Sequence, residues 1–270
     1  MRFAVVNNIR TEAEIGLSGF CPLCSQPVIA KCGQSRIWHW AHRNIKKCDN
    51  WVESETEWHR SWKKNFPTEW QEYFFSDERT GEKHMADVRT KDNLVIEFQH
   101  SHLEPVERAS RENFYQNMIW VVDGTRLKRD FPRFQKGKSY FQTVKPGIFR
   151  INSLEEHYSQ EWLGSSVPVI FDFLGTASIE NSSDIRSKLY CLFPVKIGSS
   201  SFIAEISRKT FINTTINGEW SLRAQAFIEA LKQVRQEWQD LMDKRQRIQN
   251  NINFERFIRA TRCRQRRNRL

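Results

Sequence analysis

Cysteine is concentrated at the start of this 270-residue chain, and that clustering restricts how the start can fold. Four of the six cysteines lie in the first fifth, interleaved with two histidines: Cys21, Cys24, Cys32, His39, His42 and Cys48. Strand-like runs share the segment, at residues 3–6, 28–30 and 36–40. A segment of about 50 residues buries too little apolar surface to make its own core. We therefore expect a metal ion to staple residues 1–50 into a small zinc-ribbon-like module.

The Cys21-Pro-Leu-Cys24 motif is typical of a zinc knuckle, in which a tight turn points two thiolates at one ion. Structural zinc takes four nitrogen or sulfur ligands in a tetrahedron, and this segment offers six. The predicted ligands are Cys21, Cys24, His42 and Cys48. His39 is the main rival, and Cys32 is the least suitable because it stands beside a glycine at an expected turn. The alternative is that these cysteines are buried apolar side chains without a metal.

Two tryptophans near this motif bear on the role of the metal. Trp38 and Trp40 are expected to shield the ion from substrate, which favours a structural zinc. The first ten residues carry no recognisable secretory signal, and a reducing compartment favours metal binding by clustered cysteines over disulfides. We therefore predict a cytoplasmic protein with structural Zn²⁺.

Basic residues outnumber acidic ones, which gives a formal net charge of +10 and a pI of about 9.4. An excess of this kind suits a polyanionic partner, nucleic acid above all. Five arginines fall in the last nine residues: Arg262, Arg264, Arg266, Arg267 and Arg269. No apolar run is long enough to cross a bilayer, so no membrane association is expected.

Residues 51–206 alternate helix and strand signals, which predicts a domain of mixed helices and strands, α/β in the broad sense that includes α+β. Ser54 before the acidic run Glu55-Thr56-Glu57 predicts a helix that ends near Pro67, and a second helix is expected from Pro105. Strands are expected near residues 70–75, 84–89, 93–100, 118–122, 167–173, 189–195 and 202–206. Residues 124–165 show only weak periodicity. An apolar stripe predicts one long helix, about 220–258, in the basic region 207–270.

Acidic residues stand in two of the expected strands. Asp87 lies in the run Met85-Ala-Asp-Val88, and Glu97 and Gln99 lie in Val95-Ile-Glu-Phe-Gln99. Strand alternation places Glu97 and Gln99 on one face and their apolar neighbours on the other. An acid in a core strand is unfavourable unless it binds something, and carboxylates are the ligands that Mg²⁺ and Mn²⁺ prefer.

The expected first helix adds three polar residues to this set. Glu55, His59 and Lys63 are spaced by four, so they share one helix face. On their own they fit an ordinary salt-bridged face. Together with Asp87 and Glu97 they favour a catalytic metal site of the kind that cleaves phosphodiesters.

The order of these motifs resembles the competence protein CoiA-like family, over residues 20 to 123. The motifs that carry the resemblance are Cys21-Pro-x-Cys, His39-Trp-Ala-His42, Cys48, Glu55-x-x-x-His59-x-x-x-Lys63, Ala86-Asp87-Val88 and Ile96-Glu-Phe-Gln-x-Ser101. The resemblance implies a three-layer, restriction-endonuclease-like nuclease domain of the PD-(D/E)xK kind with an αβββαβ core. It also implies that Glu55, from the first helix, Asp87 and Glu97 bind a catalytic Mg²⁺ or Mn²⁺.

One position departs from the wider superfamily. The wider superfamily usually has a lysine two positions after the second acid, and Gln99 stands there in this chain. CoiA-like proteins also have a glutamine at this position. A lysine would supply positive charge near the reacting phosphate, whereas glutamine only forms hydrogen bonds. Lys63, His59 or a second metal ion could supply what Gln99 lacks.

The resulting hypothesis is a metal-dependent DNA nuclease that uses metal-activated water, in DNA uptake and recombination or in defence against mobile elements. One alternative is a catalytically degenerate nucleic-acid-binding protein that keeps the nuclease fold. Another is an RNA nuclease, because the metal chemistry is indifferent to the 2′-hydroxyl. A homodimer is an option, since cutting both strands of a duplex is easiest with two active sites.

Overall fold

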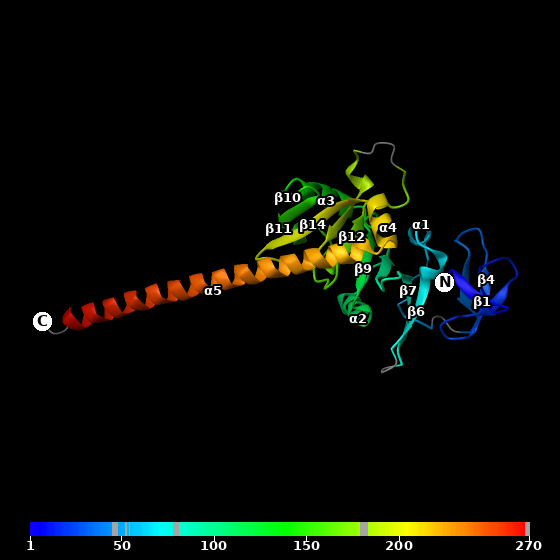
Figure 1. Cartoon of the computed structure of the whole chain (residues 1–270), viewed down its shortest axis with the longest axis horizontal. Helices are drawn as coiled ribbons and strands as arrows, with labels where there is room; N and C mark the ends of the chain where they lie inside the picture. Colours follow the sequence, from blue (N-terminus) through cyan, green and yellow to red (C-terminus); the bar gives the residue numbers. More distant parts are fainter. Residues whose placement is uncertain (45–47, 52, 54, 78–80, 179–182, 268–270) are drawn as a thin grey trace.

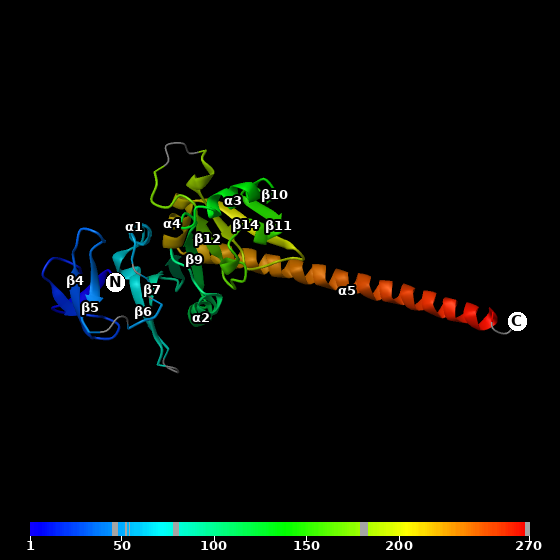
Figure 2. The same ribbon diagram turned by 180° about the vertical axis from the view of Figure 1, so that it is seen from behind.

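The computed structural model has a mixed α and β architecture with two separate β-sheets (Figure 1). It describes residues 1–267 except 45–47, 52, 54, 78–80 and 179–182. The smaller sheet lies at one end of the molecule. Helix α5 (Glu219–Arg267) projects from the larger sheet at the other end, so the two chain termini lie far apart (Figures 1 and 2).

The smaller sheet forms an N-terminal module, and all of its strand pairs are antiparallel. Its order is β2-β1-β3-β4-β5, from β1 (Phe3–Val6), β2 (Ile9–Glu12), β3 (Ser18–Phe20), β4 (Pro27–Lys31) and β5 (His39–His42). The turn between β1 and β2 consists of Asn7 and Asn8, both with positive φ. Asparagine tolerates this left-handed conformation, and a two-residue hairpin turn requires it.

The expectation that the module has no core of its own is wrong in part. A small cluster of buried residues fills the space against the sheet: Ala4, Ala13, Cys21, Val28 and Trp40. Two of these five are alanines and one is a cysteine, so the apolar contribution of the cluster is modest. The strand expected at 36–40 is also displaced: β5 runs from His39 to His42.

The larger sheet has nine strands in the order β10-β11-β14-β13-β12-β9-β8-β7-β6. Their bounds are β6 Gln71–Ser76, β7 Lys83–Arg89, β8 Val95–Gln99, β9 Met118–Asp123, β10 Gln142–Lys145, β11 Ile148–Asn152, β12 Val169–Asp172, β13 Lys188–Leu192 and β14 Ser200–Ser207. Strand β9 runs parallel to β8 and β12, and the other pairs are antiparallel.

Helices cover both faces of this sheet. One face packs against α1 (Glu57–Lys63), α4 (Arg208–Ile216) and the start of α5, and the other against α2 (Pro105–Tyr115) and α3 (Asp130–Lys138). The alternation expected for β8 is confirmed, since Ile96 and Phe98 join the first core and Val95 joins the second. Short 3-10 helices span Thr68–Trp70, Leu154–Glu156, Gln160–Trp162 and Ile185–Ser187.

The start of the first helix differs from the prediction. Helix α1 begins at Glu57, and Thr56 is its cap, because the Thr56 hydroxyl accepts the His59 N–H at 3.3 Å. Glu55 therefore precedes the helix instead of lying on it, and Ser54 lies outside the described residues. The stretch 124–165, left without elements by its weak periodicity, contains α3, β10 and β11.

The C-terminal helix is longer than expected. Its 49 residues extend over about 74 Å at 1.5 Å per residue. Trp220, Ala224 and Leu231 anchor its start in the core, and beyond them Val234 and Ile248 are half-exposed. No helix in the described part of the chain is both long enough and apolar enough for a bilayer span.

Candidate functional site

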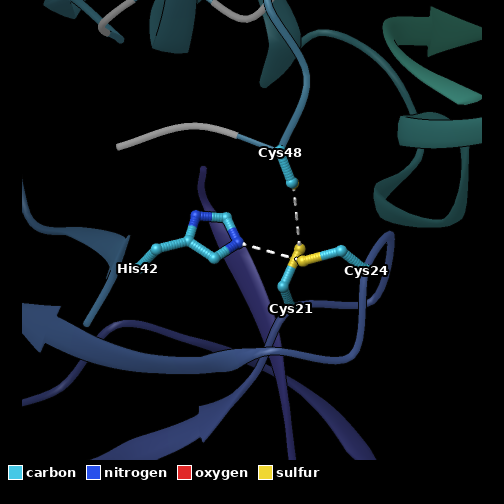
Figure 3. A group of neighbouring side chains, drawn as sticks. All are labelled: Cys21, Cys24, His42 and Cys48. Carbon is cyan, nitrogen blue, oxygen red and sulfur yellow. Dashed lines mark hydrogen bonds between the residues drawn. The ribbon is translucent and has the colours of Figure 1, made fainter. Parts of the chain in front are cut away.

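Four side chains of the N-terminal module converge in a Cys/His cluster formed by Cys21, Cys24, His42 and Cys48 (Figure 3). Their ligand atoms all lie within 4.8 Å of one another. The sulfurs of Cys21 and Cys48 are 3.7 Å apart, and Cys24 Sγ lies 3.2 Å from His42 Nε2. Zinc–sulfur bonds of about 2.3 Å place two sulfurs of a tetrahedron about 3.8 Å apart. The cluster therefore suits a structural metal such as zinc.

Local structure explains why these four residues meet. Cys21 and Cys24 bracket the turn after β3, which closes when the N–H of Ser25, at φ 57°, donates to the Cys21 carbonyl at 2.8 Å. His42 ends β5, and Cys48 lies where the chain leaves the module. Burial raises the pKa of the Cys21 and Cys48 thiols, so a bound dication is what would stabilise their thiolate forms.

The cluster contains the four residues that the sequence favoured. His39, the rival, lies outside it with Nδ1 2.9 Å from the carbonyl oxygen of Ile37, and Cys32 is also outside. The two tryptophans expected to shield the metal lie in different surroundings. Trp40 is buried in the module core, whereas Trp38, which precedes β5, is 44% exposed.

The acidic residues gather at a second place, the carboxylate site, formed by Glu55, Asp87 and Glu97. The backbone pairing between β7 and β8 ends at Val88 and Ile96. Beyond that pair, side-chain carboxylates accept main-chain N–H groups of the two strands. Asp87 Oδ2 accepts the Phe98 N–H at 2.9 Å, and Glu97 Oε1 accepts the Asp87 N–H at 3.2 Å. These two N–H groups are thus satisfied by acids of the site.

Lys63 lies at the centre of the carboxylate site. Its Nζ is 2.9 Å from Glu55, 3.3 Å from Glu72 and 3.6 Å from Asp87. Burial disfavours the charged amine, but the three carboxylates outweigh it and raise the pKa of Lys63 above its usual value. In turn, although burial opposes ionisation, Lys63 and Arg60 lower the pKa of Glu55 to about 2.

Glu97 has the opposite electrostatic surroundings. Burial, and then the nearby charge of Asp87, raise the pKa of Glu97 to about 8, although Arg111 at 3.3 Å opposes the shift. When Asp87 and Glu97 are both ionised, Arg111 does not fully compensate the repulsion between the two carboxylates. A bound dication would relieve this repulsion.

Gln99 is occupied by a partner that the sequence reading missed. Its amide hydrogen-bonds to Glu53, which also accepts the Ser101 hydroxyl at 2.5 Å and lies 3.6 Å from His59 Nε2. Glu53 and Glu72 belong to the same cavity as the predicted residues, but no motif marked them. Arg111 lies in the segment that resembles the CoiA-like family, but the sequence motifs assign it no role. In the structure it forms an ion pair with Glu97.

The two sites share walls. A cavity of about 200 Å³ borders Cys21, His42 and Cys48, and a smaller one of about 30 Å³ borders Glu97 and Asp87. Both are also lined by Met1, Glu53, Glu55 and Met85. Among the described residues, the Cys/His cluster is the group whose ligand atoms converge tightly enough to hold an ion unaided. The oxygens of the carboxylate site stand farther apart, with Lys63 between two of them.

The module's sheet carries a Cys/His cluster that could hold a structural metal. Residues 16–50 match a family model described as the N-terminal domain of competence protein CoiA. The match includes all four residues of the cluster and supports the resemblance to the CoiA-like family. No curated protein and no solved structure matches the chain.

Proposed function

We propose that this protein is a Mg²⁺- or Mn²⁺-dependent nuclease that hydrolyses DNA with metal-activated water and without a covalent intermediate. The observation that carries the proposal is that Asp87, Glu97, Glu55 and Lys63, from separate parts of the chain, line one cavity. The element order α1-β6-β7-β8-α2-β9 supports a restriction-endonuclease-like core around that cavity. The parallel pairing of β8 with β9 agrees with it.

The donor chemistry of the carboxylate site suits a hard dication. Asp87, Glu97 and Glu55 would hold the ion, and the raised pKa of Glu97 provides a reason for it to exchange its proton for a cation. When bound, Mg²⁺ or Mn²⁺ neutralises charge on the phosphate and lowers the pKa of an attacking water. Arg111 orients Glu97 through its ion pair.

Lys63 is the residue that we assign to the role left open by Gln99. Gln99 is engaged with Glu53, whereas the Lys63 amine lies 3.6 Å from Asp87 and keeps its proton. A fixed positive charge beside Asp87 stabilises negative charge that develops on a phosphate. His59 lines the same cavity, with Nε2 3.6 Å from Glu53.

DNA as the substrate is supported by the net charge of +10. The CoiA-like resemblance supports a setting in DNA uptake and recombination or in defence against mobile elements. RNA remains a substrate to compare directly, since neither the charge nor the metal chemistry separates the two polymers.

The test is cleavage of plasmid DNA, single-stranded DNA and RNA by the wild type and by Asp87→Ala and Glu97→Ala, with Mg²⁺, Mn²⁺ or no divalent metal. We expect metal-dependent DNA cleavage by the wild type and a loss of at least about 10³-fold in both variants. Glu104→Ala is the matched control, because Glu104 is an exposed acid outside the cavity. Equal cleavage by wild type and Glu97→Ala would refute the nuclease.

A non-catalytic nucleic-acid-binding protein is the rival, and one observation favours it. The carboxylate oxygens are held by Lys63, Arg60 and Arg111 and do not converge on one point. Retained DNA binding without turnover in either metal would select this reading. Cleavage of RNA alone would select an RNA nuclease.

A further inference from the structure

The Cys/His cluster and the carboxylate site are seven residues apart in the sequence, and the described residues between them form several hydrogen bonds. Asp49 follows Cys48 directly, is 3% exposed and accepts the N–H of Met85 at 2.8 Å and that of Trp51 at 2.9 Å. It also bonds to His84 Nδ1 at 2.9 Å. Met85 stands two residues before Asp87 on β7. Asp49, the neighbour of Cys48, therefore links the Cys/His cluster to β7, the strand that carries Asp87 of the carboxylate site.

The following residues extend this connection into the carboxylate site. The Trp51 carbonyl accepts Arg111 at 2.7 Å, and the same guanidinium contacts Glu97 at 3.3 Å. Glu53 then reaches Gln99, and Glu55 reaches Lys63. Within seven residues of Cys48 the chain thus supplies one of the three carboxylates and positions the arginine partner of another.

The main chain at the start of β1, with the residue before it, forms a second connection. Glu72 Oε1 accepts the N–H of Arg2 at 2.6 Å, and Glu72 Oε2 accepts that of Phe3 at 3.0 Å. Glu72 is fully buried and has an unfavourable φ of 45°, so these bonds hold it where it pairs with Lys63. Arg60 adds a bond from α1 to the Trp38 carbonyl at 2.9 Å.

We propose that metal binding by the Cys/His cluster sets the affinity of the carboxylate site for its divalent cation, with Asp49 as the positioning residue between them. This inference rests on the proposed function. With a metal in the cluster, Cys48 is fixed, and Glu53 and Glu55 are ordered before the second cation arrives. Without it, the second cation has to order that chain as it binds, which weakens its binding.

The experiment uses the full zinc-loaded chain and Mn²⁺ as the probe, with its dissociation constant measured by titration calorimetry. We expect Asp49→Asn to retain zinc, measured by mass spectrometry, and to bind Mn²⁺ about tenfold more weakly, as loss of an outer-shell partner does. Glu112→Gln is the control, because Glu112 is equally buried but hydrogen-bonds to Ser165 and Ser166. It should lower the melting temperature and leave the Mn²⁺ affinity unchanged.

The possible results separate the two proposals. Unchanged Mn²⁺ affinity in zinc-loaded Asp49→Asn overturns this inference and leaves the nuclease standing. A wild type that binds Mn²⁺ no better than Glu97→Ala overturns the proposed function and this inference together. Chelation of zinc from the wild type should weaken Mn²⁺ binding as Asp49→Asn does. If the zinc-free chain unfolds, the zinc-loaded variant alone decides.

Discussion

The Cys/His cluster and the carboxylate site both gather potential ligands for a cation, but in different electrostatic surroundings. In the cluster, three sulfurs and a histidine nitrogen converge within 4.8 Å of one another, and no salt bridge to a lysine or arginine is formed by these four described residues. In the carboxylate site, Lys63 and Arg60 form ion pairs with Glu55, and Arg111 forms one with Glu97 without cancelling its repulsion from Asp87. A metal in the Cys/His cluster would therefore have no protein cation to displace, whereas a cation in the carboxylate site would have to replace existing ion pairs.

The largest effect is expected from breaking the cluster. Cys21→Ser combined with Cys24→Ser should abolish zinc binding and unfold the module, because the binding free energy of a structural zinc is also folding free energy, about 10–16 kcal/mol in zinc-finger peptides. Zinc content and limited proteolysis within residues 1–50 are the measurements. Cys32→Ser, a cysteine outside the cluster, should keep both at wild-type levels. A zinc-replete double variant would contradict the assignment.

The next largest effect tests the internal charge of the carboxylate site. Lys63→Met leaves Glu55, Glu72 and Asp87 without their shared cation and should destabilise the fold by about 3–5 kcal/mol. Urea unfolding measures the loss, with the exposed neighbour Lys64→Met as the control. Added Mn²⁺ should recover more stability in the Lys63 variant than in the wild type. Equal losses in the two variants would show that Lys63 contributes no more to stability than an exposed lysine does.

A pH dependence should distinguish the two sites further. Because burial and Asp87 raise the pKa of Glu97 to about 8, the folded chain keeps a proton that the unfolded chain releases near pH 4.5. Its contribution to stability is complete at low pH and is lost as the pH rises toward 8, by up to about 1.4 kcal/mol per pH unit. Urea unfolding between pH 5.5 and 8 without Mg²⁺ measures it. Glu97→Gln should remove this part of the slope; an unchanged slope would rule out Glu97 as its source.

The smallest effect concerns the choice between two histidines. His39→Ala should change zinc affinity by less than about threefold, because His39 faces the Ile37 carbonyl outside the cluster. His42→Ala removes a residue of the cluster and should weaken zinc by at least about 100-fold. Competition with a chromophoric chelator measures both constants. A reversal of this order would make His39 the ligand.

Much of the architecture was accessible from local patterns. The strand at residues 3–6, the helix from Pro105 and the alternation in β8 follow from periodicity, capping and proline placement, which depend on near neighbours. The two-residue displacement of the first helix has a local cause as well. Ser54 and Thr56 both suit a cap by residue type, and in the structure the Thr56 hydroxyl accepts the His59 N–H.

The partners of the carboxylate site were beyond such patterns. Glu72 was hidden in an expected strand, and its role depends on main-chain donors about 70 residues away. Glu53 gains its role from Gln99, 46 residues further on. Pairings over such separations are fixed by the packing of α1 and the module against the sheet, to which single-sequence periodicity is blind.

The sequence by itself favoured Cys21, Cys24, His42 and Cys48 as the Cys/His cluster, because a CxxC turn and two further ligands within 24 residues leave few ways to build a tetrahedron. It kept His39 as a rival, and the structure decided that choice. The sequence also determined which acids stand in adjacent strands. Only the tertiary structure decided that Lys63 lies among those acids and that the chain leaving the cluster runs into their cavity. Charge neutralisation acts over a few ångströms in space, whatever the separation along the chain.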